Sequence, residues 1–198
     1  VIDPQNEYVK LTEKYGGSTI TISRDSQTII NPLDLLGHTY AEKRLALMDM
    51  FRVMFGELSE IQKAILDRAL SQTYDRRGIS ETSYHDKAPP VLGDLYEELE
   101  RMSRKATVYE RVTYVALLNR LRMYVDGVFS FVNRQTNINV NNNFITFNIG
   151  NMPKQVKPLM MYLILEYVYS TMKKDKQRKL LVIDEAWTLL RHAGNSRH

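Results

Sequence analysis

The chain has 198 residues, a net charge of +4 and no cysteine, which excludes disulfide bonds and thiolate metal sites. This length suits one domain, or one core with an inserted subdomain. No apolar run reaches the roughly 20 residues that a membrane-spanning helix needs. The weak positive charge permits contact with nucleic acid or an anionic membrane surface but does not require it.

The first 39 residues have the pattern of an α/β core. Residues 1–3 read as a strand and residues 6–11 as a short helix that Gly16-Gly17 ends, because glycine tolerates a positive φ there. The β-branched, alternating residues 18–23 predict a second strand. Residues 31–34, Asn-Pro-Leu-Asp, predict a turn that leaves the sheet. One face of the short helix is expected to carry Tyr8, Leu11 and Tyr15.

Residues 40–127 change in character and predict an all-helical insertion. Apolar residues recur there at helical spacing in four successive stretches. Ser59 and Gln62 form a capping-box pattern at the start of the second stretch. The predicted buried stripes are Leu47, Met48, Phe51, Met54 and Phe55; Ile61, Ile65, Leu66, Ala69 and Leu70; Leu92, Leu95, Leu99 and Met102; and Val112, Val115, Leu118, Leu121, Tyr124 and Val125.

Residues 128–198 return to the α/β pattern. Residues 136–140 and 144–149 read as a hairpin around a turn of three asparagines. Pro158 is suited to the first turn of a helix whose apolar face includes Leu159 and Leu163. That helix leads to a strand at 180–184, and a strand, a helix and a strand in this order predict a parallel sheet.

The strand at 180–184 ends in Asp184 and Glu185. Four apolar residues followed by Asp-Glu are typical of the Walker B element of P-loop ATPases. There the Asp holds Mg²⁺, usually through water, and the Glu orients or deprotonates the water that attacks the γ-phosphate. We therefore expect Asp184 to be the metal residue and Glu185 the catalytic one. The simpler alternative is a buried strand that ends in two solvated acids before a helix.

The same sequence lacks the other half of a P-loop site. None of its nine glycines stands in Gly-x-x-x-x-Gly-Lys-Ser/Thr, the loop whose N–H groups cradle phosphates. The closest stretches, Gly16 to Ser18 and Gly150 to Lys154, have the wrong spacing. If the protein is an ATPase, this Walker A loop is expected upstream of Val1, and no nucleotide-binding residue is assignable within the chain.

These elements together resemble the ATPase domain of the type IV secretion and conjugative-transfer assembly ATPases, the fourth VirB component class in the HerA/FtsK-like branch of P-loop proteins. The resemblance rests on Ile2 to Tyr8, Gly16-Gly17, Asn31 to Asp34, the strand 144–149 and Leu181 to Trp187. It implies a RecA-like α/β core with a mainly parallel sheet, interrupted by a helical insertion. Residues 1–39 and 128–198 would form the core, and residues 40–127 the insertion.

The resemblance also implies cofactors and partners. ATP and Mg²⁺ would be the ligands, with no other small-molecule substrate. The protein would form a homo-oligomer, a hexameric ring in which a neighbour supplies an arginine to the γ-phosphate. It would be cytoplasmic and peripheral at the inner face of the cell membrane, beside other secretion components, with DNA as a further contact. Asp3 would end the strand beside the nucleotide loop in a structural role. The candidate arginines are Arg76, Arg77, Arg134 and Arg191.

Two other functions remain open from the sequence. One is a DNA-pumping translocase or coupling ATPase of the HerA/FtsK type, which would bind DNA with a steep salt dependence. The other is a non-catalytic docking module, in which the insertion 40–127 binds a partner and the Asp184-Glu185 pair only ends a strand.

Overall fold

The computed structural model describes residues 1–84, 86–138, 140, 142–174 and 178–186. The chain forms two compact units. We call residues 1–30 with 136–198 the α/β unit, and residues 31–135 the helical unit. The sequence placed the insertion at 40–127, whereas segments 31–39 and 128–135 also belong to the helical unit. No helix in the described ranges is long and apolar enough to cross a membrane.

The sheet of the α/β unit has three short parallel strands. They are β1 (Ile2–Asp3), β2 (Ser18–Thr21) and β3 (Ile145–Asn148), in the order β1-β3-β2. Asn148 is in register with Asp3 on one side and with Thr21 on the other. All three strands therefore end at one edge. The predicted α/β class with a parallel sheet is confirmed.

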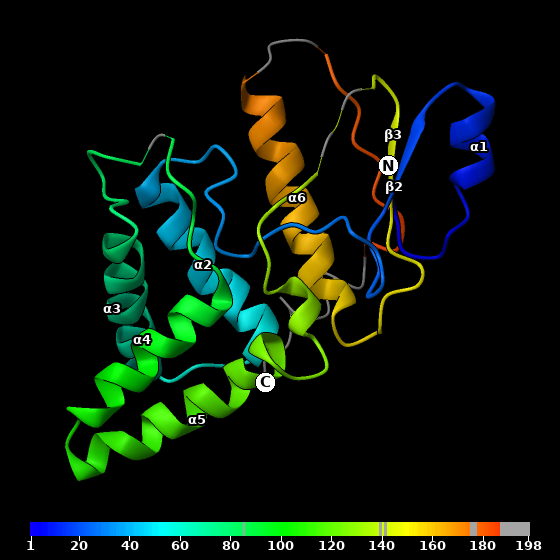
Figure 1. Ribbon diagram of the computed structural model, residues 1–198. Helices are drawn as coiled ribbons and strands as arrows, with labels where there is room; N and C mark the ends of the chain where they lie inside the picture. The colour runs from blue at the N-terminus through cyan, green and yellow to red at the C-terminus, as the bar shows by residue number, and fades with distance from the viewer. Residues whose placement is uncertain (85, 139, 141, 175–177, 187–198) are drawn as a thin grey trace. The chain divides into compact units, whose positions relative to one another are not determined.

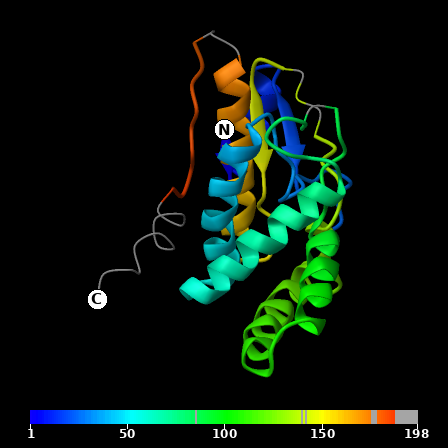
Figure 2. The same ribbon diagram turned by 90° about the vertical axis from the view of Figure 1, so that its left-hand side faces the viewer.

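One helix lies on each side of this sheet, α1 (Val9–Lys14) and α6 (Lys157–Lys174), as Figure 1 and Figure 2 show. The rings of Phe147 and Tyr167 join β3 to α6, with their centroids 6.3 Å apart. The core of this unit is mainly aliphatic. It contains Ile2, Ile22, Ile29, Ile30, Phe147, Ile149, Met152, Val156, Leu159, Met160, Met161, Leu163 and Ile164.

The short helix α1 differs from its predicted form. It begins later than expected, and Leu11 and Tyr15 are exposed. Its buried residue is Thr12, whose hydroxyl lies 2.6 Å from that of Thr146 on β3. Gly16 has a φ of +66° after the helix, as the sequence predicted. A helix of two turns can thus face the sheet with a small polar side chain.

The predicted hairpin at 136–149 is wrong. Only its second half is a strand, and β3 pairs in parallel with β1 and β2. The described residues of 136–140 lie outside any strand. Asn137 instead forms two hydrogen bonds with the backbone of Ile29. The Asn137 Oδ1 accepts the Ile29 N–H over 2.8 Å, and the Asn137 backbone N–H donates to the Ile29 carbonyl. Alternating β-branched residues predict a strand but not its partner, which lies far away in the chain.

The segment before Asp184 is also less regular than predicted. Its pairing is a single parallel bridge, Ile2 to Ile183. Ile2 donates its N–H to Val182 over 2.9 Å, and Asp184 donates to the Ile2 carbonyl over 3.1 Å. A continuous apolar run is typical of a strand covered on both faces, but Leu180 is 87% exposed, so this expectation is wrong for the start of the segment. The predicted parallel direction is confirmed.

The helical unit contains α2 (Tyr40–Phe55), α3 (Glu60–Arg76), α4 (Leu92–Arg104), α5 (Val108–Val125) and the 3₁₀ turn η1 (Ser130–Val132). Thr39, Ser59 and Thr107 begin α2, α3 and α5 with complete capping boxes. In each box the hydroxyl accepts an N–H bond, and a Glu or Gln three residues later accepts one from the cap residue. Helix α4 packs against both α3 and α5.

Most residues of the predicted helical stripes are buried. The exposed exceptions are Ile61, Val112 and Val115, and the half-buried ones are Met48, Met54, Phe55, Leu118 and Val125. Val112 is 73% exposed. Helix α5 buries Leu121 and Tyr124 as predicted, together with Tyr114 and Leu117, which the sequence did not select. Apolar residues lie on nearly every side of α5, so periodicity alone could not select its buried face.

Candidate functional site

The candidate site lies at the carboxyl edge of the parallel sheet. Asp3 ends β1, and Asn148 ends β3 in register with it. The bridge between Ile2 and Ile183 brings Asp184 to the same edge, on the other side of β1. The sequence predicted this place for Asp184 and Glu185, since ligand sites of parallel sheets lie at the carboxyl ends of the strands.

Asp3 is a fully buried carboxylate that organises the following loop. It accepts backbone N–H bonds from Gln5 at 3.2 Å, Glu7 at 3.1 Å and Tyr8 at 3.0 Å. Such bonds to a charged acceptor are stronger than neutral ones. Asp3 thus closes residues 4–8 into a fixed turn, in agreement with the structural role expected for it.

Asp184 and Glu185 form a tight turn after the bridge. The Glu185 N–H donates to Asp184 Oδ1 over 2.8 Å. Glu185 has a φ of +53°, which costs a non-glycine residue roughly 1–2 kcal/mol. Backbone strain of this kind is concentrated at functional sites. The Gln5 side-chain amide donates to Glu185 Oε1 over 3.2 Å, which links the turn to the Asp3 loop.

A lysine from α6 reaches the same loop. Lys157 Nζ donates to the Pro4 carbonyl over 2.7 Å. Burial lowers the pKa of Lys157, and Lys154 lowers it further, while the carboxylates of Glu185 and Asp3 act in the opposite direction. A cation therefore lies within electrostatic reach of both carboxylates.

An amide pair continues the site toward β3. Asn148 donates through Nδ2 to Asn6 Oδ1 over 2.5 Å and accepts the Gly150 N–H over 2.8 Å. A Cβ on Gly150 would lie 2.8 Å from the Asn6 Cβ. Glycine therefore allows the chain after β3 to approach the loop after β1.

Sequence reasoning missed the roles of Gln5, Lys157 and Asn148 at this edge. The Asp-Pro-x-x-Glu-Tyr motif contains Gln5, and Asn148 closes an alternating strand, so both had a weak signal. Lys157 had none, because its contact with Pro4 spans 153 residues of sequence.

The donor chemistry fits a Mg²⁺ ion held by few protein atoms. Among the described residues, no three His, Cys, Asp or Glu side chains gather as a metal cage. Mg²⁺ in phosphate-transfer sites keeps several waters and uses one or two carboxylates with substrate phosphates. Asp184 uses Oδ1 for the turn and has no hydrogen-bond partner at Oδ2 within the described chain. This oxygen is thus suited to bind a water of such an ion.

Two of the candidate arginines are held in ion pairs of the helical unit. Arg76 Nε lies 3.0 Å from the buried carboxylate of Glu98. Arg77 donates to both oxygens of Asp94 over 2.8 Å. These side chains have local structural roles, whatever else they do.

The other two candidate arginines are Arg134 and Arg191. Arg134 donates through Nε to the Phe131 carbonyl over 3.0 Å. Arg191 lies outside the described residues. The origin of an arginine for the γ-phosphate thus stays a prediction.

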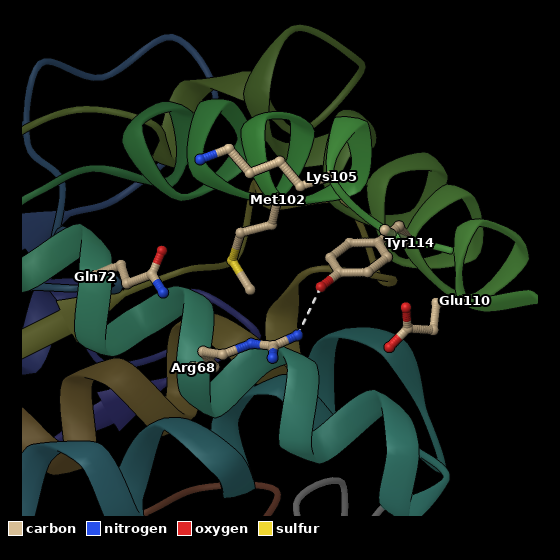
Figure 3. A pocket seen from close by; sticks show the side chains of 7 residues that line it. Arg68, Gln72, Met102, Lys105, Glu110 and Tyr114 are labelled. Carbon is tan, nitrogen blue, oxygen red and sulfur yellow. Dashed lines mark hydrogen bonds between the residues drawn. The ribbon is translucent and has the colours of Figure 1, made fainter. Parts of the chain in front are cut away.

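A hollow of about 220 Å³ lies in the helical unit, between α3, α4 and α5 (Figure 3). Arg68 donates to the Tyr114 hydroxyl over 2.8 Å, and Glu110 accepts the Thr107 N–H over 3.0 Å. Arg68 and Glu110 therefore form bonds within the helical unit itself. The lining residues are Arg68, Gln72, Met102, Lys105, Ala106, Glu110 and Tyr114.

Comparison with known proteins settles the family. The TraG P-loop domain family matches the chain over residues 1–198. The chain belongs to this family. No curated protein matches it. This TraG P-loop domain is also similar to the solved structure of VirB4 of Thermoanaerobacter pseudethanolicus, with a TM-score of 0.83 and 27% sequence identity. The similarity covers 95% of this chain and 74% of the other. The expected resemblance to the VirB4 class is thereby confirmed.

Proposed function

We propose that this TraG P-loop domain is part of an ATP-hydrolysing motor that powers assembly of, or substrate transport through, a type IV secretion or conjugation system. One observation carries the proposal: the Asp184-Glu185 turn lies beside the end of β1, at the carboxyl edge of a parallel sheet. P-loop enzymes place the acids that act on Mg²⁺ and water at this edge. The family match supports the same chemistry.

Each acid has a distinct role in this proposal. Asp184 holds Mg²⁺ through water, and Glu185 orients the attacking water and accepts its proton. Asp3 keeps the adjacent loop in place through its three backbone bonds. When bound, Mg²⁺ neutralises charge on the phosphate oxygens. ATP is the substrate, and no other small molecule is required.

The missing phosphate loop gives a first expectation. These 198 residues contain no Gly-x-x-x-x-Gly-Lys-Ser/Thr, so their backbone offers no standard cradle for the β- and γ-phosphates. We expect the isolated chain to bind MgATP weakly. Saturable, tight MgATP binding by residues 1–198 alone would contradict this expectation.

The deciding experiment is Glu185→Gln in protein that carries this chain together with a Walker A loop. The amide keeps the shape of the side chain but cannot accept a proton. We expect hydrolysis to fall on the order of 100-fold or more, since general bases contribute about 10²–10⁴, while MgATP binding stays within about twofold. Hydrolysis at the normal rate in Glu185→Gln would refute the assignment of Glu185.

A matched control is Glu13→Gln on α1, because Glu13 is an exposed glutamate of the same unit. It should leave both binding and turnover unchanged. Equal losses in the two variants would indicate a general effect of charge rather than catalysis.

The proposal includes an assembly. The motor would be a homo-oligomer, a hexameric ring with an arginine donated by a neighbour, peripheral to the inner face of the cell membrane beside other secretion components. Light scattering of the purified protein with and without MgATP tests the ring. A monomer under both conditions would argue against it.

A further inference from the structure

We propose that Gln5 is a positioning residue for Glu185: its side-chain amide holds the Glu185 carboxylate in the orientation from which it acts on water. The inference rests on the proposed function and adds a residue to it. It comes from one contact, the 3.2 Å bond from Gln5 Nε2 to Glu185 Oε1, and from the way each end of that contact is fixed.

The backbone around Gln5 is anchored on both sides. Asp3 accepts the N–H of Gln5 itself over 3.2 Å and that of Glu7 over 3.1 Å. Lys157 Nζ holds the preceding carbonyl, that of Pro4, over 2.7 Å. The loop is therefore set by a buried carboxylate and by a lysine from α6. The exposed Gln5 side chain projects from a backbone whose position is determined by its neighbours.

The backbone of Glu185 is equally constrained. Its N–H is bound to Asp184 Oδ1 over 2.8 Å, and its φ is +53°. Asp184 in turn donates its own N–H to the Ile2 carbonyl. Glu185 is thus presented by a strained turn attached to β1, and Gln5 by the loop that leaves β1. The bond between them joins residues 180 apart in sequence.

A base that must meet a water molecule gains from this arrangement. A flexible carboxylate samples several rotamers, and only some of them place an oxygen toward the nucleophile. A donor fixed on Oε1 reduces that freedom, which lowers the entropic part of the barrier. Gln5 has no ionisable group, so it orients the carboxylate without competing for the proton.

Two substitutions at one position separate orientation from general structure. Gln5→Ala removes the donor, and Gln5→Glu places a second carboxylate against the first. Gln155→Ala is the matched control, because Gln155 is an exposed glutamine of the same unit with no bond to the site in the described chain. All variants are made in protein that also carries a Walker A loop.

We expect kcat to fall about 3- to 10-fold in Gln5→Ala, as loss of one hydrogen bond to an exposed charged group implies. The kcat of Gln5→Glu should fall further, because its carboxylate repels that of Glu185. The Kd for a fluorescent MgATP analogue should stay within about twofold in every variant, since a residue acting only on the chemical step changes kcat without changing binding. Melting temperatures should match the parent within about 2 °C.

A second measurement ties the effect to Glu185. In the Glu185→Gln background there is no base to orient, so adding Gln5→Ala should cause no further loss of hydrolysis. If Gln5→Ala reduced hydrolysis by the same factor in the Glu185→Gln background as in the parent, the inference would be overturned. It would also be overturned if Gln5→Ala behaved like Gln155→Ala, or if the loss appeared in Kd rather than kcat. These outcomes differ from failure of the proposed function, in which Glu185→Gln itself would hydrolyse ATP normally.

Discussion

The helices of the helical unit depend largely on residues close together in the sequence, whereas the sheet of the α/β unit depends on residues far apart. In the helical unit each long helix is defined by nearby residues, and three begin with complete capping boxes. In the α/β unit the strands have two to four residues, and β1 finds its partner β3 more than 140 residues away. Short strands form only in the context of partners that are distant in sequence, whereas capped helices depend largely on local sequence.

The difference extends to the candidate site. The helical unit uses its charged residues on one another, as in the pairs Arg76–Glu98 and Arg77–Asp94. The α/β unit gathers Asp3, Lys157 and Glu185 at one edge from three distant parts of the chain. Distant pairing is therefore what assembles the candidate site. Four predictions test and sharpen this contrast.

The largest effect is expected for Leu99→Ala in α4. Leu99 is fully buried in the helical unit, so its truncation should cost about 3–4 kcal/mol of unfolding free energy. Urea unfolding measures the loss, and the exposed Leu45→Ala should change it by less than about 0.5 kcal/mol. Hydrogen exchange then locates the loss. Equal loss of protection in residues 31–135 and 1–30 would show that the two units unfold as one.

The next effect depends on pH. Burial raises the pKa of Tyr124 from its ordinary 10.0 to about 12, so the unfolded chain loses this proton first as the pH rises. The contribution of the neutral Tyr124 side chain to the unfolding free energy is complete below about pH 10, and it is lost as the pH rises to about 12. The unfolding free energy should fall by about 2–3 kcal/mol across this window.

Tyr124→Phe isolates that contribution from other buried tyrosines. It removes the bond from the hydroxyl to the Met54 carbonyl, 3.1 Å long, and should cost about 1 kcal/mol at neutral pH. The difference between parent and variant should shrink and reverse between pH 10 and pH 12. A constant difference would contradict the assigned pKa.

Gly17→Ala should destabilise the α/β unit by about 2 kcal/mol. A Cβ there would lie 2.8 Å from the Phe144 carbonyl oxygen and 2.8 Å from the Thr12 methyl, so α1 and β3 must separate to admit it. Gly56→Ala is the comparison in the helical unit. Its φ is +77° with no atom within 4 Å of the added Cβ, so only local strain of about 1 kcal/mol is expected. In thermal unfolding, Gly17→Ala should have a lower melting temperature than Gly56→Ala. The reverse order would weaken the contrast between the two units.

The smallest effect is expected for a helix cap. Thr107→Ala removes the hydroxyl that accepts the Glu110 N–H and should cost about 1 kcal/mol. Thr107→Ser retains the acceptor and should stay within a few tenths of the parent. If Thr107→Ala and Thr107→Ser have the same unfolding free energy, the side-chain cap of α5 makes no measurable contribution to stability.

Local patterns predicted part of this protein well. The Ser59–Gln62 box and the stripe Leu92, Leu95, Leu99 and Met102 are as expected, because a capping box and a helical period each lie within a few residues of sequence. The pattern of four apolar residues and Asp-Glu also located Asp184 at the edge of the sheet. The same local signals were only partly right for α5, whose surface is apolar on several sides: Leu121 and Tyr124 are buried as predicted, but Val112 and Val115 are exposed.

The sequence by itself determined the α/β class, and it predicted the helical insertion and the two acids of the candidate site, since these depend on hydrophobic period and residue chemistry. Only the tertiary structure decided that β3 lies between β1 and β2 rather than in a hairpin. It also decided that Gln5 meets Glu185 and that Lys157 reaches Pro4. These contacts span more than 150 residues, and their geometry follows from strand register and the packing of α6, which no short stretch of sequence contains.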